Sequence, residues 1–330
     1  MRLNGENLVI TGGAGFIGNH TIKRILEEDS LFEREKIWIV DNFHSGTLDN
    51  IDTSSKKVKI IEEDVRSFDE FFKIMKEINA SGKIAGMIHL AAIISQSEAY
   101  KNPKLAVDTN VQGTLNALEI TRRLNIERFV YSSSVAVFGE PMRLPIDELH
   151  PRRPINLYGL TKLMGEQLVQ RFNEDYGIKT VSLRFFNVYG PGMRIGPYAG
   201  VIHNFITRML KREQPRIFGD GIQTRDFVYV EDIAEANLKS LLSKTTGSFN
   251  IGAGIETSIN DLHRLLVDLI EPDNDKVFYE SSKDGDVKRS LANIGLSRER
   301  LKWHPKTSLK DGLLETINWY RNRSKITIQR

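Results

Sequence analysis

Tyr158 and Lys162 lie four residues apart in the stretch NLYGLTKLMGEQ, a spacing that places both side chains on one face of a helix. Such a pair could take the proton of a substrate hydroxyl group while a hydride leaves the same carbon, because a phenolate is a general base. Free tyrosine titrates at about 10. An ammonium about 4 Å away contributes roughly 4 kcal/mol at an effective dielectric constant of about 20, before desolvation is subtracted. Lys162 is therefore expected to lower the pKa of Tyr158.

The same spacing occurs twice more in the chain, so spacing alone is weak support. Pro103 falls between Tyr100 and Lys104 and would break a helix there, and the stretch YESSKDGD around Tyr279 has the composition of a loop. Only LYGLTKLMGEQLVQRF continues with apolar residues at helical intervals. The plainer alternative, a surface tyrosine beside a solvated lysine, stays open at this point.

A second group of residues suited to chemistry is the glycine-rich stretch VITGGAGFIG near the N-terminus. Gly12, Gly15 and Gly18 follow an apolar strand pattern and stand at the start of an amphipathic helix pattern. Glycines permit a tight turn and a close approach of backbone to phosphate, and a helix N-terminus presents unpaired N–H groups. This context predicts a site for the pyrophosphate of a dinucleotide, against the alternative of a purely structural turn.

Asp41 ends the second predicted strand, 23 residues after Gly18. A carboxylate there can accept hydrogen bonds from both hydroxyl groups of an adenosine ribose, and it repels a 2′-phosphate. The stretch DNFHSG holds no Arg or Lys to offset that repulsion. The predicted cofactor is therefore NAD rather than NADP, although an aspartate that only caps the strand end would look the same.

The elements that must position these residues belong to an ordinary globular chain. It has 330 residues, 40% hydrophobic content, no cysteine and a net charge of +3 that is spread along the sequence. The lack of cysteine excludes disulfides, thiolate chemistry and cysteine-ligated zinc, and no metal site is predicted. The longest apolar stretch, IAGMIHLAAII, is too short to cross a bilayer, and the first residues lack the apolar segment of a signal peptide. We expect a cytoplasmic protein that binds neither a membrane nor a nucleic acid.

Strand patterns alternate with helix patterns through the first half of the chain. NLVITG, KIWIV, KVKIIEED, GMIHLAA, ERFVYSSS and KTVSLRFF each precede or follow a helical stretch, which predicts an α/β fold with a doubly wound parallel sheet of the Rossmann type. We expect an NAD-binding domain over residues 1–186, with a returning segment near 226–252. A smaller, interleaved α/β substrate domain is expected over 187–225 and 253–330.

Together these stretches resemble the extended short-chain dehydrogenase/reductase family and, within it, the UDP-sugar 4-epimerases. The resemblance covers nearly the whole chain and rests on TGGAGFIG, HLAA, TNVQGT, YGLTK, RFFNVYGP, GDGIQTRDFVYVEDIAEA and GDVKRSLANI. It implies that Ser134, on the strand before the Tyr158 helix, completes a catalytic set with Tyr158 and Lys162. Ser134 would hydrogen-bond the reacting oxygen, Lys162 would bind the nicotinamide ribose, and the nicotinamide cation would also favour the phenolate.

The resemblance further implies which residues contact the two ligands. Those expected to contact NAD are Gly12, Gly15, Phe16, Ile17, Asp41, Asn42, Ser45, Gly46, Asp64, Val65, Leu90, Ala91, Ala92, Asn110, Ser132, Tyr158, Lys162 and Phe186. Those expected to contact a UDP-hexose, mostly from the second domain, are Ser95, Ser134, Tyr158, Asn187, Phe218, Arg225, Lys283 and Ser290.

Some of the substrate positions have structural alternatives or depart from the family pattern. Arg225 could form a surface ion pair, Phe218 could be a core aromatic residue, and Ser95 could be a simple loop serine. Lys283 stands where many relatives carry arginine, which replaces a planar fork with a point charge and weakens the expected phosphate contact. His203 stands where relatives usually carry proline, and a buried, hydrogen-bonded histidine is expected there.

The lack of an acidic residue directly after Ser134 narrows the choice among the reactions that the resemblance implies. Relatives that eliminate water or carbon dioxide carry an acidic residue just after the hydroxyl residue, whereas here Val135 follows Ser134 and no carboxylate comes before Glu140. The implied reaction is oxidation at C4 of UDP-glucose or UDP-galactose, rotation of the 4-keto sugar, and return of the hydride to its other face. Ser290 is small at a position where bulky residues exclude a 2-acetamido group, so the N-acetyl sugars should also fit.

Three alternatives stay open. They are a UDP-glucuronate 4-epimerase, another nucleotide-sugar oxidoreductase or dehydratase that uses the same three catalytic residues, and a noncatalytic NAD-binding protein. A homodimer is expected from the resemblance, and the stretches 98–124 and 154–176 hold more apolar positions than one buried stripe requires.

Overall fold

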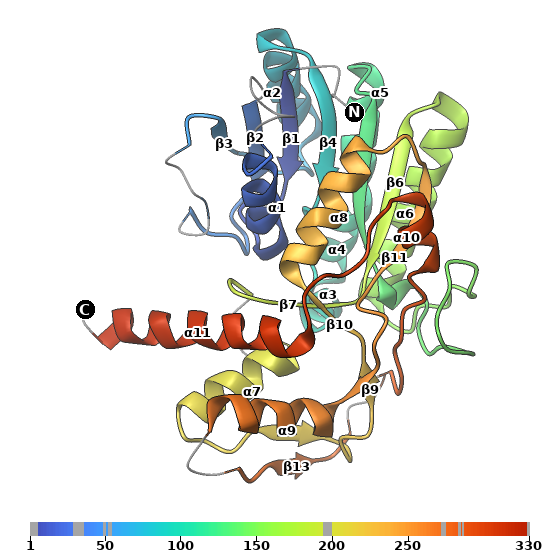
Figure 1. The fold of residues 1–330 in the computed structure, drawn as a ribbon. Coiled ribbons are helices and arrows are strands. Elements are labelled where there is room, and N and C mark those ends of the chain that lie inside the picture. The colour runs from blue at the N-terminus through green and yellow to red at the C-terminus, as the bar shows by residue number, and fades with distance from the viewer. Residues whose placement is uncertain are drawn as a thin grey trace.

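The first lobe of the protein is built on one parallel sheet. The computed structural model describes residues 6–28, 36–48, 51, 55–193, 200–271, 275–282, 285 and 287–328, with side chains through residue 323. Seven strands run in the order β11-β6-β5-β4-β1-β2-β3, and every neighbouring pair is parallel (Figure 1). The strands are β1 (Asn7–Thr11), β2 (Lys36–Asp41), β3 (Val58–Glu62), β4 (Ile84–His89), β5 (Arg128–Ser134), β6 (Lys179–Phe185) and β11 (Gly247–Ile251).

Helices cover both faces of this sheet. On one side lie α1 (Phe16–Leu26) and α8 (Val230–Leu242), and on the other lie α2 (Phe68–Ser81), α5 (Gly113–Arg123) and α6 (Leu157–Tyr176) (Figure 1). Successive side chains of a strand point to opposite faces, so a strand between two helix layers is apolar at every position. In β1, Leu8 and Ile10 join the core that holds Ile22 of α1, whereas Val9 joins the core that holds Phe71 of α2. The prediction of a doubly wound α/β fold is confirmed.

Two short helices interrupt the connection from β4 to α5. These are α3 (Gln96–Lys101) and α4 (Pro103–Val107), and a π-helical turn over Asp108–Gln112 leads on into α5. Asn102 separates α3 from α4, so Tyr100 and Lys104 lie on different helices. Tyr279 lies in a strand rather than a helix. Of the three Tyr-x-x-x-Lys stretches, the one in α6 is therefore the helical one among the described residues.

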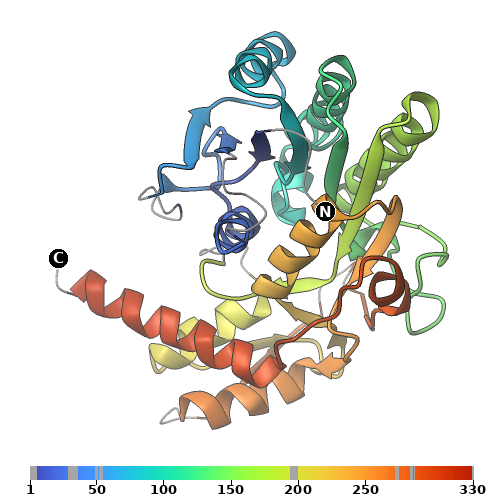
Figure 2. The ribbon, with the colours of Figure 1, turned by 45° about the horizontal axis from the view of Figure 1, so that its top comes forward.

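The second lobe has its own apolar core. Its helices are α7 (Val201–Leu210), α9 (Ile259–Ile270) and α11 (Leu309–Ile328), which lie together below the sheet in Figure 2. Short strands pair as β7 (Asn187–Tyr189) with β10 (Phe227–Tyr229), β8 (Arg216–Phe218) with β13 (Phe278–Glu280), and β9 (Thr224–Arg225) with β12 (Thr257–Ser258). Phe205, Leu262, Leu266, Leu313 and Ile317 are buried between the three helices.

The chain passes between the two lobes more than once. α8 and β11, both from residues 226–252, lie with the first lobe. So does α10 (Gly295–Arg300), which packs on β11 although its residues are expected in the second domain from the sequence. Leu301 and Trp303 explain this placement, because both are buried in the core of the first lobe and Trp303 Nε1 donates to the Asp232 carbonyl oxygen at 2.8 Å. The division into an NAD-binding and a substrate-binding domain stays a prediction.

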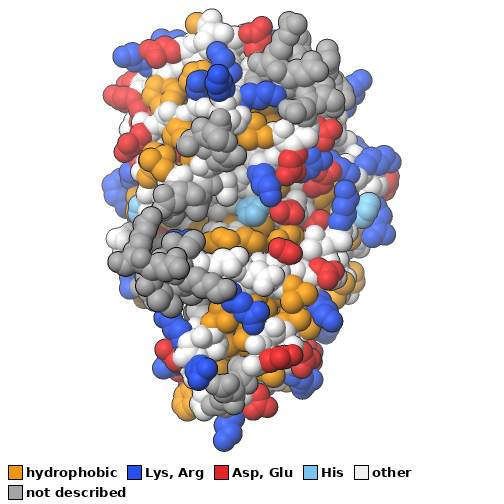
Figure 3. All heavy atoms as spheres, turned by 60° about the vertical axis from the view of Figure 1, so that its left-hand side comes forward, with side chains coloured by type: hydrophobic (Ala, Val, Ile, Leu, Met, Phe, Trp, Pro, Cys, Tyr) orange, Lys and Arg blue, Asp and Glu red, His pale blue; other side chains and the backbone are white. Residues whose placement is uncertain are grey.

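The surface carries both signs of charge. On the face in Figure 3, basic and acidic side chains are interspersed around apolar ones, with no large field of a single sign. Within the part of the chain that the structure describes, no helix combines the length and the apolar character needed to span a membrane.

Candidate active site

A cavity of about 350 Å³ opens at the carboxyl ends of the parallel strands. The turns after β1, β2, β3 and β4 and the ends of β5 and β6 form its walls, because parallel strands all end at the same edge of a sheet. Most of the predicted NAD-contacting and catalytic residues line it. They are Gly12, Gly15, Phe16, Ile17, Asp41, Asn42, Ser45, Val65, Leu90, Ala91, Ala92, Ser132, Ser134, Tyr158, Lys162 and Phe186.

Glycines shape the turn after β1. Gly12 has a φ of 70°, and a Cβ atom there would lie 2.6 Å from the Ala91 backbone nitrogen. A Cβ atom on Gly18 would lie 2.6 Å from the Gly12 carbonyl oxygen, so the turn cannot close with larger residues. α1 begins directly after Gly15, whose lack of a side chain leaves the first N–H groups of the helix open to the cavity. This cradle of bare backbone at a helix N-terminus fits the phosphates of a dinucleotide.

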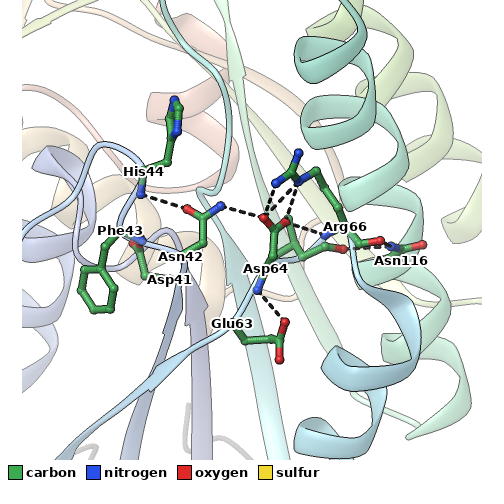
Figure 4. Close-up of polar contacts among 9 residues, drawn as sticks. Asp41, Asn42, Phe43, His44, Glu63, Asp64, Arg66 and Asn116 are labelled. Atoms are coloured by element: carbon green, nitrogen blue, oxygen red, sulfur yellow. Dashed lines mark hydrogen bonds and ion pairs between the residues drawn. The ribbon is translucent and has the colours of Figure 1, made fainter.

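Asp41 is held at the end of β2 by its own neighbourhood. Its Oδ2 accepts from Ala14 N at 2.9 Å, and its Oδ1 accepts from Phe43 N at 2.8 Å. Burial raises the pKa of Asp41, and the two backbone hydrogen bonds limit that rise. Figure 4 shows Asp41 beside Asn42, with Asp64 and Arg66 on the neighbouring turn. A carboxylate fixed in this way suits the two hydroxyl groups of an adenosine ribose.

Three residues expected to contact NAD do not line the cavity. Gly46 packs against Ala14, where a Cβ atom would come within 2.7 Å of the Ala14 carbonyl carbon. The Asp64 carboxylate is taken up by hydrogen bonds with neighbouring side chains. Asn110 is buried, and its amide accepts from Ile93 N at 2.7 Å and donates to Ile93 O at 2.9 Å. These contacts tie all three residues to the walls of the cavity, and their contact with NAD stays a prediction.

The three predicted catalytic residues meet on one wall. β5 ends at Ser134, and α6 begins after Asn156, whose side chain caps the helix by accepting from a backbone N–H of the first turn at 2.8 Å. This start places Tyr158 within hydrogen-bonding contact of Ser134. One turn later, Lys162 Nζ donates to the Ser132 carbonyl oxygen at 2.8 Å and is buried. The structure thus brings Ser134, Tyr158 and Lys162 together.

Burial dominates the electrostatics of this set. It raises the pKa of Tyr158, and the hydrogen bond from Ser134 opposes that rise only in part. It also lowers the pKa of Lys162 to about 7. The expectation that Lys162 lowers the pKa of Tyr158 is therefore wrong for the protein's own groups, because spacing along a helix says nothing about the loss of solvation. A lysine that is only partly protonated at neutral pH is also a weaker source of positive charge.

Glu166 opposes the effect of burial on Lys162, and sequence reasoning missed it. It lies one turn after Lys162 on α6 with its side chain 1% exposed, and its negative charge raises the pKa of Lys162. Its carboxylate accepts from Arg184 Nε and Nη2, both at 2.9 Å, and from Ser133 Oγ at 2.5 Å. The available signal was an acidic residue four positions after the lysine on a helix that packs on the sheet.

A second, smaller cavity of about 100 Å³ holds part of the predicted substrate site. It is lined by Asn187 from β7, Arg225 from β9 and Ser290, together with Val135 and Ala136, which directly follow Ser134. Ser290 is 3% exposed, and its Oγ has no hydrogen-bond partner within the described part of the chain. Arg225 Nη1 donates to the Thr224 carbonyl oxygen at 2.6 Å.

Ser95 and Phe218, two further residues predicted to contact the substrate, line neither cavity. Ser95 caps α3 by accepting from Glu98 N at 3.1 Å, and its contact with the sugar stays a prediction. Phe218 is partly buried in β8 and lines neither cavity. Lys283 lies outside the described residues. His203 is buried, with its Nδ1 2.5 Å from the Tyr320 hydroxyl oxygen, as expected for a hydrogen-bonded core histidine.

Several lining residues were not predicted from the sequence. In the larger cavity they include His44, Glu63, Arg66, Ile93, Ile94, Leu105 and Thr109, and in the smaller one they include Gln96, Asn156 and Val287. Arg66 follows the predicted Asp64-Val65 pair by one position, and Gln96 follows Ser95, so a search two residues wide around each motif would have found both.

Comparison with known proteins defines the class. The sequence profile of the NAD dependent epimerase/dehydratase family matches residues 8–252, and the chain belongs to this family. Solved structures that resemble it include complexes with NAD. The predictions of the family and of NAD as the cofactor are confirmed.

Individual relatives are UDP-sugar enzymes. The chain is 39% identical over 320 residues to a putative UDP-glucose 4-epimerase of Methanocaldococcus jannaschii, covering 96% of this chain and 99% of the relative. It is 34% identical to the UDP-N-acetylglucosamine 4-epimerase from Methanobrevibacter ruminantium M1, solved with UDP-N-acetylmuramic acid, with a TM-score of 0.89 over 98% of this chain and 100% of that one. The UDP-glucose 4-epimerase from Thermotoga maritima, solved with UDP-glucose, is 33% identical with a TM-score of 0.89, covering 96% and 99% of the two chains.

Proposed function

We propose that this protein is an NAD-dependent UDP-sugar 4-epimerase, an isomerase. The observation that carries the proposal is the position of Ser134, Tyr158 and Lys162 on the wall of the larger cavity, beside the smaller cavity with Asn187 and Arg225. The two cavities adjoin at the end of β5, since Ser134, its last residue, lines one and Val135, the next residue, lines the other. A dinucleotide in the first and a nucleotide sugar in the second would meet there. The relatives with UDP-sugar 4-epimerase names support the same reaction.

The chain's own residues would handle the proton. Tyr158 would take the proton of the C4 hydroxyl group, with Ser134 hydrogen-bonded to the reacting oxygen and Lys162 holding the nicotinamide ribose. NAD, when bound, supplies a hydride acceptor that takes the hydrogen of C4 and gives it back. After the 4-keto sugar has rotated in the site so that its other face meets the nicotinamide, Tyr158 would return the proton to the C4 oxygen. Because burial raises the pKa of Tyr158, the phenolate needs a nearby positive charge to form.

The described lining of the smaller cavity holds no acid of the kind that other reactions of this family need. Val135 and Ala136 line it where relatives that eliminate water carry acidic side chains, and none of its described lining residues is Asp or Glu. Val135 and Ala136 cannot donate a proton at C5 or C6 of the sugar, as the acidic residues of those relatives would do in an elimination. This favours epimerisation over dehydration or decarboxylation.

The diphosphate and the sugar would bind between the two lobes. Arg225 would present a planar guanidinium to the diphosphate oxygens, with Asn187 as a further polar contact. Ser290 would face the sugar, because its buried hydroxyl lines the smaller cavity. Its small size supports acceptance of 2-acetamido sugars as well as UDP-glucose and UDP-galactose.

The proposal is tested by incubating the purified protein with UDP-glucose, UDP-N-acetylglucosamine and UDP-glucuronate and separating the C4 epimers of each. Conversion of at least one sugar without net NADH is expected. Tyr158→Phe should reduce the rate roughly 100- to 10,000-fold, the usual contribution of a general base, while NAD stays bound. Tyr176→Phe, at the far end of the same helix, is the matched control and should leave the rate unchanged. Stoichiometric NADH formation would show a net oxidoreductase instead.

We also propose that the protein is a homodimer whose subunits meet through α6 and the short helices beside it. Leu160 and Met164 are exposed by 43% and 38% on successive turns of α6, and Val107 at the end of α4 is exposed by 37%. α4 and α6 pack against each other, so these apolar side chains belong to one region of the surface. The cytoplasmic location stays a prediction from the sequence.

A further inference from the structure

The larger cavity contains a cation that bears on the choice between NAD and NADP. The stretch directly after Asp41 in the sequence holds no Arg or Lys. In the structure β2 and β3 are adjacent, with Asp41 opposite Glu62, so the turn after β3 brings Arg66 to the same cavity. A free guanidinium there could bind a 2′-phosphate, because its planar fork matches phosphate oxygens. An unpaired Arg66 would therefore weaken the preference for NAD over NADP that Asp41 provides.

The guanidinium of Arg66 forms an ion pair with the carboxylate of Asp64. Arg66 Nη2 donates to Asp64 Oδ2 at 2.6 Å, and Arg66 Nε lies 2.9 Å from Oδ1 and 3.0 Å from Oδ2. Arg66 N also donates to Oδ1 at 2.9 Å, and Asn42 Nδ2 donates to Oδ2 at 2.8 Å (Figure 4). Although burial alone would raise it, the bonds from Arg66 and Asn42 lower the pKa of Asp64 to about 2. Asp64 is therefore ionised at neutral pH and keeps Arg66 engaged.

The charges at this end of the cavity sum to a negative value. Asp41 and Glu63 line it, Asp64 lies just behind, and Arg66 is the fixed cation among the described residues of this group. Three carboxylates against one guanidinium leave two uncompensated negative charges. His44, which also lines the cavity, is paired with Glu98 at 2.6 Å. A 2′-phosphate with nearly two negative charges would enter an unfavourable field.

We propose that Asp64 is a second determinant of NAD over NADP, acting as a positioning residue that withholds Arg66 from a 2′-phosphate. Asp41 repels the phosphate directly, and Asp64 removes the cation that would otherwise compensate. Both features act on the adenosine end of the cofactor and leave the Ser134–Tyr158–Lys162 set untouched. The proposal therefore stands or falls independently of the sugar on which the enzyme acts.

The test compares how well NADH and NADPH displace bound NAD from the intact protein, followed by the fluorescence of the bound dihydronicotinamide. Asp64→Asn removes the charge, keeps the shape and frees the guanidinium. It should shift the NADPH-to-NADH affinity ratio about tenfold in favour of NADPH. Any loss of a contact with the adenosine itself cancels in the ratio, because both nucleotides share that part. Asp64→Ser is the second variant should the first fold poorly.

The matched control is the double variant Asp64→Asn/Arg66→Ala. If the gain in NADPH affinity comes from Arg66, the double variant should return to the wild-type NADPH-to-NADH affinity ratio. Arg66→Ala alone should not favour NADPH. An unchanged ratio in both Asp64 variants would overturn the proposal. A gain that survives the removal of Arg66 would overturn it too, because loss of a negative charge would then be sufficient.

Discussion

At the scale of single residues, the proposed position of Ser290 beside the sugar gives a sharp test of the choice of sugar. It lines a cavity of only about 100 Å³, and its side chain is buried. Ser290→Tyr would fill much of that space, so turnover of the N-acetyl sugars should fall at least tenfold while UDP-glucose still reacts. Ser290→Ala is the control and should keep both activities. Parallel losses for both kinds of sugar in Ser290→Tyr would show that this position does not face the 2-substituent.

Lys162 makes a prediction about stability and pH. Burial lowers its pKa to about 7 in the folded protein, against about 10.4 in an unfolded chain. Between these values the unfolded state binds more protons, so the penalty is greatest below pH 7 and is relieved as the pH rises. From pH 7 to pH 9 the free energy of unfolding of nucleotide-free protein should rise by about 2 kcal/mol relative to Lys162→Met. Urea unfolding of both proteins at both pH values measures this change. The same difference in free energy of unfolding between wild type and Lys162→Met at pH 7 and pH 9 would contradict the shifted pKa.

The residues show what a single sequence can and cannot reveal. The sequence predicts that Gly12, Gly15 and Asp41 lie at the nucleotide cavity, because each stands at a characteristic distance from the end of a strand. The supporting role of Asn110 could not be found in this way, because its partner Ile93 is 17 positions away. The direction of the Tyr158 pKa shift was missed for the same reason. It depends on burial by several elements and not on the distance to Lys162 along one helix.

At the scale of elements, the buried pair Glu166–Arg184 ties α6 to β6 behind the catalytic wall. Both side chains are almost inaccessible, at 1% and 3% exposure. Glu166→Gln leaves a buried guanidinium without its counter-charge, which typically costs about 3 kcal/mol or more. We expect a clearly lower unfolding midpoint, whereas Glu174→Gln on the exposed face of α6 should change stability by less than about 0.5 kcal/mol. Equal midpoints for the two variants would show that the pair is not stabilising.

Helices and strands could be predicted where apolar residues recur at regular intervals. Their placement could not be predicted where it depends on contacts between residues far apart in the sequence. The parallel strands and the helix carrying Tyr158 follow from apolar patterns and from the absence of proline. The placement of α10 on β11 does not follow, because Leu301 and Trp303 look like ordinary apolar residues of a C-terminal segment. Arg66 reaches the cavity only because β2 and β3 are neighbours in the sheet. Strand order is not contained in any one stretch of sequence.

At the scale of the whole molecule, the proposed dimer depends on the exposed apolar side chains of α6. Sedimentation of the wild type should give twice the subunit mass of 37.6 kDa. Leu160→Lys/Met164→Lys places two charges on that surface and should give monomers, because charged side chains are depleted from interface cores. Tyr176→Lys changes an exposed aromatic residue at the end of the same helix and should leave the dimer intact. A monomeric wild type would refute the proposal.

The central claim is that one hydride leaves C4 of a UDP-hexose and returns to the same carbon from the other side. The most direct measurement uses UDP-glucose carrying deuterium at C4 and follows the label in the epimer by NMR in ordinary water. We predict that the deuterium stays at C4 of the product, with no exchange into solvent and no accumulation of reduced nucleotide. Loss of the label from C4, or its transfer to released NADH, would contradict the account.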